Sequence, residues 1–248
     1  MKENIAELKE LFIKVRDRID PIPTERKGNT GIGKTFEEAC GIVENNFAAA
    51  DFKGIEIKSH RDYSGSYITL FTKSPTSPRG INTILRKTYG TPDAEFPEIK
   101  VLHTSLFTTH YNTHKGGYNF KLEIDYENEA IKLLVQDKFS QEIVDDRAKW
   151  SFQAIENIIE KKLKYIAYIT AKVEKKEDKE YFRYTDMIIL TGLTFEKFIK
   201  LLKEGVIMFD IRIGAYKTGK NKGKNHDHGS GFRISKKQLS RAFQIEEV

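Results

Sequence analysis

The sequence of 248 residues contains a single cysteine, Cys40. One cysteine excludes an internal disulfide and any zinc site built from several cysteines. The chain also lacks any run close to the ~20 apolar residues that a membrane-spanning helix needs. Its first residues, Met1-Lys2-Glu3-Asn4, contain no apolar signal-peptide core. We therefore expect a cytoplasmic protein that has no membrane partner.

Acidic residues are in the minority, because 42 lysines and arginines face 36 aspartates and glutamates and leave a net charge of +6. The excess is local, and a local basic excess is the footprint expected for a polyanion partner. Mild basicity is common among proteins, so charge alone supports nucleic-acid binding only modestly. The length and the 39% of hydrophobic residues allow one large domain or two small ones with a sizeable core.

The most informative stretch runs from Asp51 to Lys58. Ile55 and Ile57 alternate with Glu56 and Lys58, which predicts a strand with a carboxylate and an ammonium on one face. Asp51 can bend back over the strand end and face Glu56. Two carboxylates a few Å apart bind a hard cation such as Mg²⁺ through oxygen, and the lysine can position or activate a water. The order Asp, gap, Glu-x-Lys is the pattern of PD-(D/E)xK nucleases, although a solvated strand face in a lysine-rich protein also produces it.

Residues Gly28–Thr35 satisfy the nucleotide-binding pattern G-x-x-x-x-G-K-[ST]. Such a loop needs a buried strand immediately before it, and Pro23–Lys27 cannot form one. We interpret the segment as a glycine-rich entry into a helix that Thr35 and Glu38 cap as a T-x-x-E capping box. Glu37 then points away from the apolar stripe, towards the strand at Ile55. The expected buried stripe of this helix comprises Phe36, Ala39, Cys40, Val43 and Phe47.

Hydrophobic periodicity predicts further elements along the chain. Expected helices cover residues 3–19, 152–163 and 194–203, and expected strands cover 67–72, 118–124, 130–135, 165–170 and 181–189. We expect strand 67–72 to pair with Ile55–Ser59. Residues 73–90 read as a loop without acids that contains Lys73, Arg79, Arg86 and Lys87, either solvated or facing phosphates. Residues 91–116 are weakly patterned, and their histidines lack ligand spacing.

The C-terminal part combines alternating strands with a polar tip. Phe209, Ile211 and Ile213 are expected to face inward while Asp210 and Arg212 face outward together, and Arg233 is outward on a later strand. Arginine forks can grip guanine O6 and N7, and carboxylates can accept a hydrogen bond from cytosine N4. These chemistries suit the set Asp210, Arg212, His226, Asp227, His228 and Arg233, with nearby lysines such as Lys217 on phosphates. There are two alternatives to base recognition by this tip. One is a flexible solvated hairpin, and the other is a metal site of His226, Asp227 and His228.

Several of these motifs together resemble one family. They are Gly31-Ile32-Gly33-Lys34-Thr35-Phe36-Glu37, Asp51 with Glu56-Ile57-Lys58, Thr72-Lys73-Ser74-Pro75, and Asp210-Ile211-Arg212-Ile213-Gly214-Ala215-Tyr216. In this order they resemble the MvaI/BcnI type II restriction endonucleases, of the MutH-like branch of PD-(D/E)xK nucleases, and most closely the MvaI-like members. The resemblance runs from about residue 25 to residue 234, includes the His226-Asp227-His228-Gly229 tip, and replaces the nucleotide-binding interpretation.

The resemblance implies a mixed α/β fold. It consists of a PD-(D/E)xK nuclease core, with a mixed sheet flanked by helices, and a β-rich DNA-recognition lobe. We expect residues 1–90 with 117–170 to form the catalytic lobe and residues 171–248 the recognition lobe. The loops of 73–116 are candidate contributors to the DNA cleft.

The resemblance also implies roles for single residues. Asp51, Glu56 and Lys58 match the catalytic triad, and Glu37 matches the additional helix acid of the branch. Asp51, Glu56 and the backbone carbonyl of Ile57 are the implied ligands of Mg²⁺; we expect Mn²⁺ to substitute and Ca²⁺ to support binding without cleavage. The implied DNA contacts are Asp210, Arg212, His226, Asp227, His228, Arg233, Lys73, Arg79, Arg86, Lys217 and Tyr216.

The implied activity is cleavage of double-stranded DNA by a monomer that cuts one strand at a time. MvaI-like enzymes cut CCWGG and BcnI-like enzymes cut CCSGG; the loop 217–225 differs in detail and leaves the central base pair open. A cognate DNA methyltransferase is expected in the same system, though not as a bound partner. Two alternatives are a MutH-like repair nickase and a catalytically inactive, sequence-specific DNA-binding protein.

Overall fold

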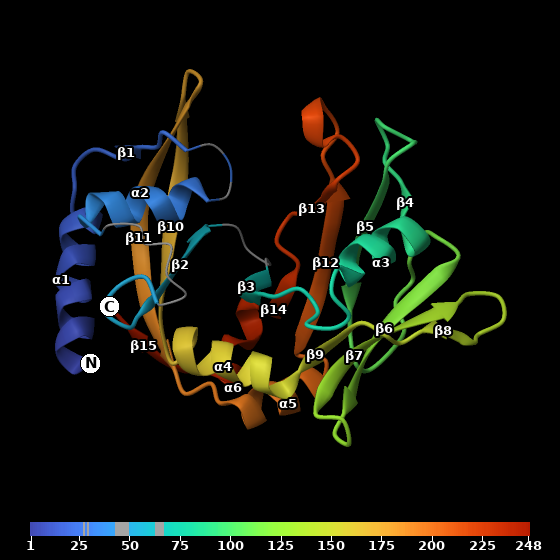
Figure 1. Ribbon diagram of the computed structural model, residues 1–248. Helices are drawn as coiled ribbons and strands as arrows, with labels where there is room; N and C mark the ends of the chain where they lie inside the picture. Colours follow the sequence, from blue (N-terminus) through green and yellow to red (C-terminus); the bar gives the residue numbers. More distant parts are fainter. Residues whose placement is uncertain (27, 29, 43–49, 63–66) are drawn as a thin grey trace. The chain divides into compact units, whose positions relative to one another are not determined.

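The computed structural model describes residues 1–26, 28, 30–42, 50–62 and 67–248 and divides the chain into two compact units (Figure 1). The first unit contains Met1–Ser66, Ile158–Thr194 and Ser240–Val248, and the second contains Tyr67–Asn157 and Phe195–Leu239. Helices and strands occur in both units, so the expected mixed α/β class is confirmed.

The first unit is built on one sheet. Its long antiparallel pair is β10 (Tyr165–Lys176) and β11 (Lys179–Thr191), and β2 (Glu56–Arg61) runs parallel to β10. The order among the described strands is β1-β11-β10-β2, where β1 is Ile22–Pro23, and β15 (Gln244–Glu247) also pairs with β11. Strand β2, which begins at Glu56, thus stands at one end of this path.

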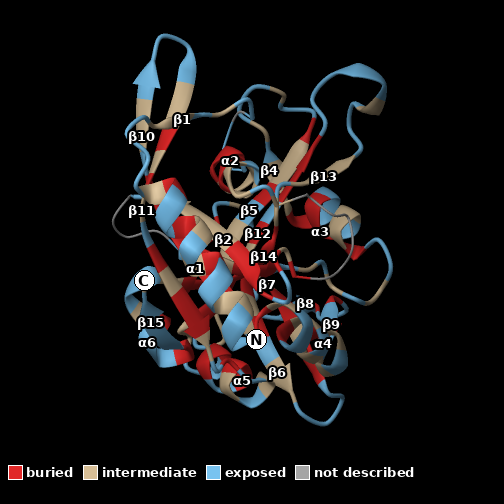
Figure 2. Cartoon of the chain, turned by 90° about the vertical axis from the view of Figure 1, so that its left-hand side faces the viewer, coloured by how far each residue is buried: buried red, intermediate tan, exposed pale blue. Residues whose placement is uncertain are grey.

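Two helices cover a face of this sheet. Helix α1 (Lys2–Arg16) and helix α2 (Gly31–Ala39) bury apolar side chains against β10 and β11, and Figure 2 shows the exposed residues of α1 turned outward. Phe36 lies at the centre, with its ring 6.4 Å from that of Phe12 and 5.3 Å from that of Tyr184. The Tyr184 hydroxyl donates a hydrogen bond of 2.7 Å to the carbonyl of Ile32, which ties α2 to the sheet.

The expected capping box of α2 is wrong. The helix begins at Gly31 after Thr30, so Thr35 lies buried within it, and Glu38 instead pairs with Lys34 at 3.6 Å. Glycine is required at the first residue of the helix, because a Cβ at Gly31 would lie 2.2 Å from the carbonyl oxygen of Arg26. The helix ends at Ala39, and Gly41 takes the left-handed conformation common at helix ends. Val43 and Phe47, expected on the same stripe, lie outside the described residues.

The larger sheet of the second unit contains the strands that the C-terminal pattern predicts. Its order among the described strands is β3-β14-β12-β5-β4, with β13 on β12. The bounds are β3 Tyr67–Thr72, β4 Thr91–Pro92, β5 Lys100–Leu106, β12 Ile207–Ala215, β13 Asn225–Asp227 and β14 Gly231–Ser235. Phe209, Ile211 and Ile213 are buried as expected.

Strand β3 does not pair with β2, so the expected pairing of 67–72 with Ile55–Ser59 is wrong. It pairs with β14 because its Phe71 packs against Phe232 and Phe198, with ring centroids 5.2 and 5.7 Å apart. Gly231 allows the close approach of the two strands, since a Cβ there would lie 2.4 Å from the carbonyl oxygen of Phe71. This partner is distant in sequence, so local periodicity gives no indication of it.

The remaining described elements are a smaller sheet and several helices. A smaller sheet contains β6 (Tyr118–Asp125), β7 (Ala130–Asp137), β8 (Ile143–Asp145) and β9 (Lys149–Ser151), and confirms the predicted hairpin of 118–135. The other helices are α3 (Ile81–Tyr89), α4 (Phe152–Lys162), α5 (Phe195–Lys203), α6 (Leu239–Ala242), η1 (Gly219–Asn221) and η2 (Lys236–Gln238). Helix α3 was not expected, because residues 73–90 read as a loop.

An aromatic cluster holds the second unit together. The Trp150 ring lies 4.6 Å from that of Phe209 and 5.6 Å from that of Phe232. The indole N–H of Trp150 donates to the carbonyl of Lys73 at 2.9 Å, so this buried polar group is satisfied. The segment that leaves β3 is thereby anchored to the core.

The two units differ from the lobes expected from the sequence. Residues 67–90 and 117–157 belong to the second unit, while residues 171–194 and 240–248 belong to the first. The difference arises because each sheet is completed by strands that are far apart in the chain. No helix in the described part of the chain has the length and apolar character needed to cross a membrane.

We predict that Tyr184→Phe lowers the free energy of unfolding by about 1 kcal/mol, since it removes one buried hydrogen bond without changing the ring. Urea denaturation followed by circular dichroism measures the change. Tyr126→Phe is the matched control because Tyr126 is 58% exposed, and we expect it to stay within about 0.5 kcal/mol of the parent. Equal effects of the two substitutions would contradict the tie between α2 and the sheet.

Candidate functional site

A tight turn places Asp51 at the start of β2. Phe52 and Ile55 exchange two backbone hydrogen bonds, of 2.9 and 2.7 Å, around Lys53 and Gly54. Both central residues have positive φ, 44° and 89°, as a type I′ hairpin turn requires. The chain therefore reverses, and one oxygen of Asp51 (Oδ2) accepts the backbone N–H of Ile57 at 2.8 Å. Asp51 thus bends back over the strand end.

Glu56 is the acid at the centre of this group. Its residue is only 9% exposed, and its Oε1 lies 3.2 Å from the ammonium of Lys58. Its Oε2 is buried and has no hydrogen-bond donor among the described residues. A buried carboxylate oxygen without a hydrogen-bond donor is costly, so this atom is suited to a cation in addition to the lysine that approaches it at ion-pair distance.

A second lysine, Lys162, approaches the same carboxylate. Its ammonium lies 3.7 Å from Glu56 Oε2, at the last residue of α4. Lys162 was not among the predicted site residues, because it lies in a run of helical lysines with no motif spacing to Glu56. The buried Glu56 carboxylate therefore has an ammonium group near each oxygen, that of Lys58 at Oε1 and that of Lys162 at Oε2.

Glu37 lies on α2 where the helix meets β2. A Cβ at Gly33 would be 2.9 Å from Ser59 Oγ and 3.9 Å from Glu37 Oε1, so both side chains approach the same point. Burial, with the charge of Glu37 as a smaller cause, raises the pKa of Cys40 to about 12. The helix thus holds an acidic group beside the strand that carries Glu56 and Lys58.

The donor set limits which cation the group could bind. The described residues contain no cluster of three or more histidine, cysteine, aspartate or glutamate side chains that could hold a metal ion. The alternative of a metal site at His226, Asp227 and His228 therefore receives no support. Asp51, Glu56 and backbone oxygen are hard ligands, which favour Mg²⁺ over softer metals.

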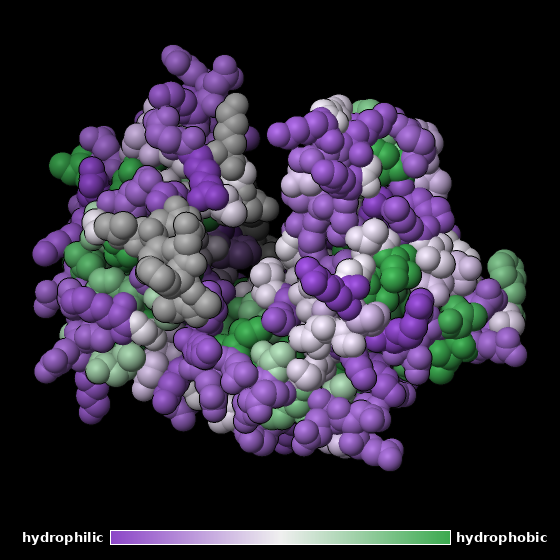
Figure 3. Space-filling model, viewed as in Figure 1, coloured by the Kyte–Doolittle hydropathy of each residue, from purple (hydrophilic) through white to green (hydrophobic). Residues whose placement is uncertain are grey.

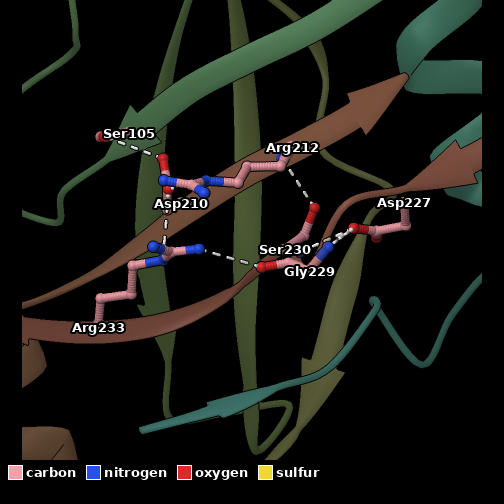
Figure 4. A network of polar contacts seen from close by, with 7 residues as sticks. All are labelled: Ser105, Asp210, Arg212, Asp227, Gly229, Ser230 and Arg233. Atoms are coloured by element: carbon pink, nitrogen blue, oxygen red, sulfur yellow. Dashed lines mark hydrogen bonds and ion pairs between the residues drawn. The ribbon is translucent and has the colours of Figure 1, made fainter. Parts of the chain in front are cut away.

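A second polar group lies on the larger sheet of the second unit. Asp210 on β12 accepts a hydrogen bond from Ser105 at 3.1 Å with Oδ1 and one from Arg212 Nε at 2.7 Å with Oδ2 (Figure 4). Arg233 Nε on β14 lies 3.3 Å from the same Oδ2. One carboxylate thus orients two guanidinium groups, and Ser105 is a member that sequence analysis missed.

The two arginines differ in exposure. The side chain of Arg212 is 46% exposed, whereas that of Arg233 is 11% exposed. Arg233 also donates a hydrogen bond to the carbonyl of Gly229 at 3.2 Å. Burial lowers the pKa of its guanidinium group from the ordinary arginine value. Arg212 is therefore placed to contact a partner molecule, and Arg233 is held more rigidly.

Asp227 organises the tip next to these arginines. Its Oδ1 accepts the backbone N–H groups of Gly229 and Ser230, at 3.0 and 2.7 Å, and Ser230 Oγ accepts the backbone N–H of Arg212 at 2.8 Å. Figure 4 shows these contacts running from Asp227 to Arg212. The turn after β13 is therefore joined to β12 by hydrogen bonds.

Aromatic and imidazole rings gather along the same strands. Tyr216 stacks on His226 at 4.5 Å with an interplanar angle of 4°, and the His226 and His228 rings are 4.3 Å apart. Gly214 makes room, since a Cβ there would lie 2.8 Å from His228 Nε2. Partial desolvation, with the neighbouring imidazoles of His226 and His103, lowers the pKa of His228, so that this imidazole is neutral at pH 7. It can both donate and accept a hydrogen bond.

The basic residues expected to contact DNA have diverse surroundings. Arg79 is exposed, and Lys73 is half-buried with its carbonyl bound to Trp150. Lys217 pairs with Glu95 at 3.0 Å and with Asp93 at 3.3 Å. In Figure 3 the loop that contains Lys217, between β12 and β13, has a hydrophilic surface.

Arg86 is not a surface residue. It is 3% exposed and donates hydrogen bonds within the second unit. The expectation that it faces a phosphate is therefore corrected, and the reason is that residues 81–89 form a helix that turns this side chain inward.

Comparisons with known proteins identify the family of the chain. Residues 10–243 match the MvaI/BcnI restriction endonuclease family. The structure described as "Restriction endonuclease MvaI-cognate DNA substrate complex" is 42% identical, with a TM-score of 0.89, and the match covers 100% of this chain and 99% of that chain. "Restriction endonuclease MvaI in the absence of DNA" is 38% identical, with a TM-score of 0.63 and coverage of 100% and 98%. None of the curated proteins compared with the sequence matches it significantly.

The family match spans most of the chain, and the identity to MvaI exceeds what a shared fold alone would require. The acids and lysines at the start of β2 and the arginines on β12 and β14 lie within the matched residues. The chain therefore belongs to the MvaI/BcnI restriction endonuclease family and is a site-specific deoxyribonuclease.

Proposed function

We propose that this enzyme hydrolyses phosphodiester bonds of double-stranded DNA at a short pseudopalindromic CC-N-GG sequence, with CCWGG as the site, in a reaction that depends on Mg²⁺. The proposal is supported by two contacts at the start of one strand, where Asp51 accepts the backbone N–H of Ile57 at 2.8 Å and Lys58 lies 3.2 Å from Glu56. We further propose that it acts as a cytoplasmic monomer, cuts one strand at a time, and is accompanied by a methyltransferase that it does not bind.

The residues at the start of β2 fit a magnesium ion. The buried Oε2 of Glu56 lacks a donor among the described residues, and the neighbouring ligands are oxygens. Asp51, Glu56 and the backbone carbonyl of Ile57 would hold the ion, Mn²⁺ would substitute for it, and Ca²⁺ would support binding alone. When bound, the ion supplies positive charge that stabilises the charge developing on the scissile phosphate.

The lysines and Glu37 complete the proposed catalytic group. Lys58, held 3.2 Å from Glu56 Oε1, would orient the attacking water or, in its neutral form, accept the proton that the water loses. Lys162 would offset the buried charge of Glu56 and attract the phosphate backbone. Glu37, from α2, would orient Lys58 or the waters of a second metal ion.

Recognition would come from the surface of β12, β13 and β14. Arg212 and Arg233, both oriented by Asp210, would each bind guanine, while Asp210 or Asp227 would accept a hydrogen bond from cytosine. His226 and His228 would contact further base edges, with Tyr216 supporting His226. Lys73, Arg79 and Lys217 would contact phosphates. Lys217 would leave the carboxylates of Asp93 and Glu95 to do so.

We predict that Glu56→Gln and Asp51→Asn abolish cleavage of a supercoiled plasmid in Mg²⁺, because each removes a negatively charged cation ligand. Lys58→Met should lower the single-turnover rate by roughly 10²–10⁴-fold, the usual contribution of a proton-transfer group. Binding of a duplex with the CCWGG site in Ca²⁺ should persist in all three variants. Exposed Glu127→Gln is the control and should cleave normally; full cleavage by Glu56→Gln would exclude this catalytic group.

Fragment mapping of the plasmid tests the site and the reaction mode. Cuts confined to CCWGG, with open circles appearing before linear molecules, support a monomer that cuts strands in turn. Nicked circles that never become linear would instead indicate a repair-type nickase. Binding without any cleavage in Mg²⁺ or Mn²⁺ would indicate an inactive recognition protein.

We predict that Arg212→Ala weakens discrimination between CCWGG and a singly substituted site by about 1–3 kcal/mol, the value of one bidentate base contact. Affinity for random duplex should change little. Arg79→Ala provides the contrast: it should weaken binding to every sequence and reduce the salt slope by about one. Fluorescence anisotropy at several salt concentrations measures both, and an equal loss on random duplex would make Arg212 a phosphate contact.

A further inference from the structure

Helix α3 places two side chains against the recognition tip, residues 216–230. Asn82 and Arg86 are four residues apart and therefore lie on the same side of the helix. Arg86 contacts Asn225 at one end of β13, and Asn82 contacts Asp227 at the other. The helix thus reaches the short strand at both of its ends.

Arg86 is a buried cation whose three guanidinium nitrogens are all used. Nε donates to Asn225 Oδ1 at 3.0 Å, Nη1 to the carbonyl of Lys100 at 2.8 Å, and Nη2 to the carbonyl of Gly223 at 3.1 Å. Burial lowers its pKa, which reflects the cost of keeping the charge away from water. A buried charge is costly unless hydrogen bonds surround it, and two of the hydrogen bonds of Arg86 go to the tip, at Asn225 and Gly223.

Asn82 contacts the carboxylate of Asp227 directly. Its amide nitrogen donates to Asp227 Oδ2 at 3.1 Å and to Ser74 Oγ at 3.0 Å. The other oxygen of Asp227 is held by the backbone N–H groups of Gly229 and Ser230. The orientation of this carboxylate is therefore set by α3 together with the turn after β13.

His226 lies between these two attachment points. Its backbone pairs with Gly214 on β12, and its ring stacks on Tyr216. Asn225 and Asp227 are both held by α3. A shift of the backbone of His226 along β12 would therefore break the contact of Arg86 with Asn225 or that of Asn82 with Asp227. The direction in which the His226 and Asp227 side chains point is thereby determined before any partner binds.

We propose that Asn82 and Arg86 are positioning residues for sequence recognition, which hold the tip in the arrangement that reads base edges although neither residue touches DNA. This inference rests on the proposed function, because it needs the tip to be the reading surface. A tip ordered in advance avoids the ordering cost at binding. Random duplex, held mainly through phosphates, does not need the arrangement, so specific binding alone should depend on α3.

The test uses full-length Asn82→Ala and Arg86→Lys, each also carrying Glu56→Gln, with Ca²⁺ and a 20-bp duplex that contains CCWGG. The competitors are the same duplex with one G·C pair replaced and a random duplex. Each variant should lose about tenfold in affinity for the specific duplex and change less than twofold on the random one. In active protein, KM for the specific duplex should rise about tenfold while kcat stays within twofold.

Lys87→Met is the matched control, since Lys87 is the exposed basic neighbour of Arg86 on the same helix. It should leave the ratio of specific to random affinity unchanged. Asn82→Asp adds a variant of the same shape that places a carboxylate against Asp227, and it should reduce discrimination more than Asn82→Ala. Thermal unfolding of each protein shows whether it is folded, and Asn82→Asp and Asn82→Ala supply the result if Arg86→Lys does not fold.

The outcomes separate the inference from the function on which it rests. If the parent protein does not distinguish CCWGG from the substituted duplex, the proposed site is wrong. If the parent distinguishes them and folded Asn82 variants distinguish them equally well, the inference alone is overturned. A folded variant that loses equal affinity for specific and random duplex would also overturn it, because α3 would then serve only stability.

Discussion

The hydrogen bond from the backbone N–H of Ile57 to Asp51 is the contact on which the arrangement at the start of β2 depends. It requires the reversal at Lys53 and Gly54, and without that turn the first acid would lie along the chain before the strand. The same bond holds the Asp51 carboxylate against the backbone of the residue after Glu56, and the buried Oε2 of Glu56 lacks a hydrogen-bond donor in the described part of the chain. Local backbone geometry thus fixes the Asp51 carboxylate against the backbone of the strand that begins at Glu56.

Charge sharing is the second constraint, and it recurs in both units. In the first unit two lysines approach the two oxygens of Glu56, and in the second unit two arginines share one oxygen of Asp210. A buried charge is tolerable when opposite charges and hydrogen bonds surround it. In each group a compact acid orients longer basic side chains, whose directions would otherwise vary. Arg86 shows a different solution, with carbonyl and amide oxygens around a cation.

Sequence reasoning succeeded where the relevant spacing is short. The alternation of Glu56 with Ile57 and of Asp210 with Ile211 predicted which side chains share a strand face, and the ion pairs Lys58–Glu56 and Arg212–Asp210 follow from that alternation. It failed where the partner is distant. The pairing of β3 with β14, the inward turn of Arg86 on α3 and the approach of Lys162 to Glu56 each join segments with no common local pattern. The start of α2 was misplaced because the helix begins at Gly31 without a side-chain cap, so the T-x-x-E pattern lies inside it.

The sequence by itself determined the acid and lysine pattern of β2, the outward pair on β12 and the resemblance to a nuclease family, because residues two apart on a strand share a face whatever surrounds them. Only the tertiary structure decided which strands pair, where the two units divide, and which basic residues are buried. Those outcomes depend on packing between residues far apart in the chain, such as Trp150 with Phe209 and Phe71 with Phe232. Periodicity reports which face of a segment is apolar, but it does not report what that face will meet.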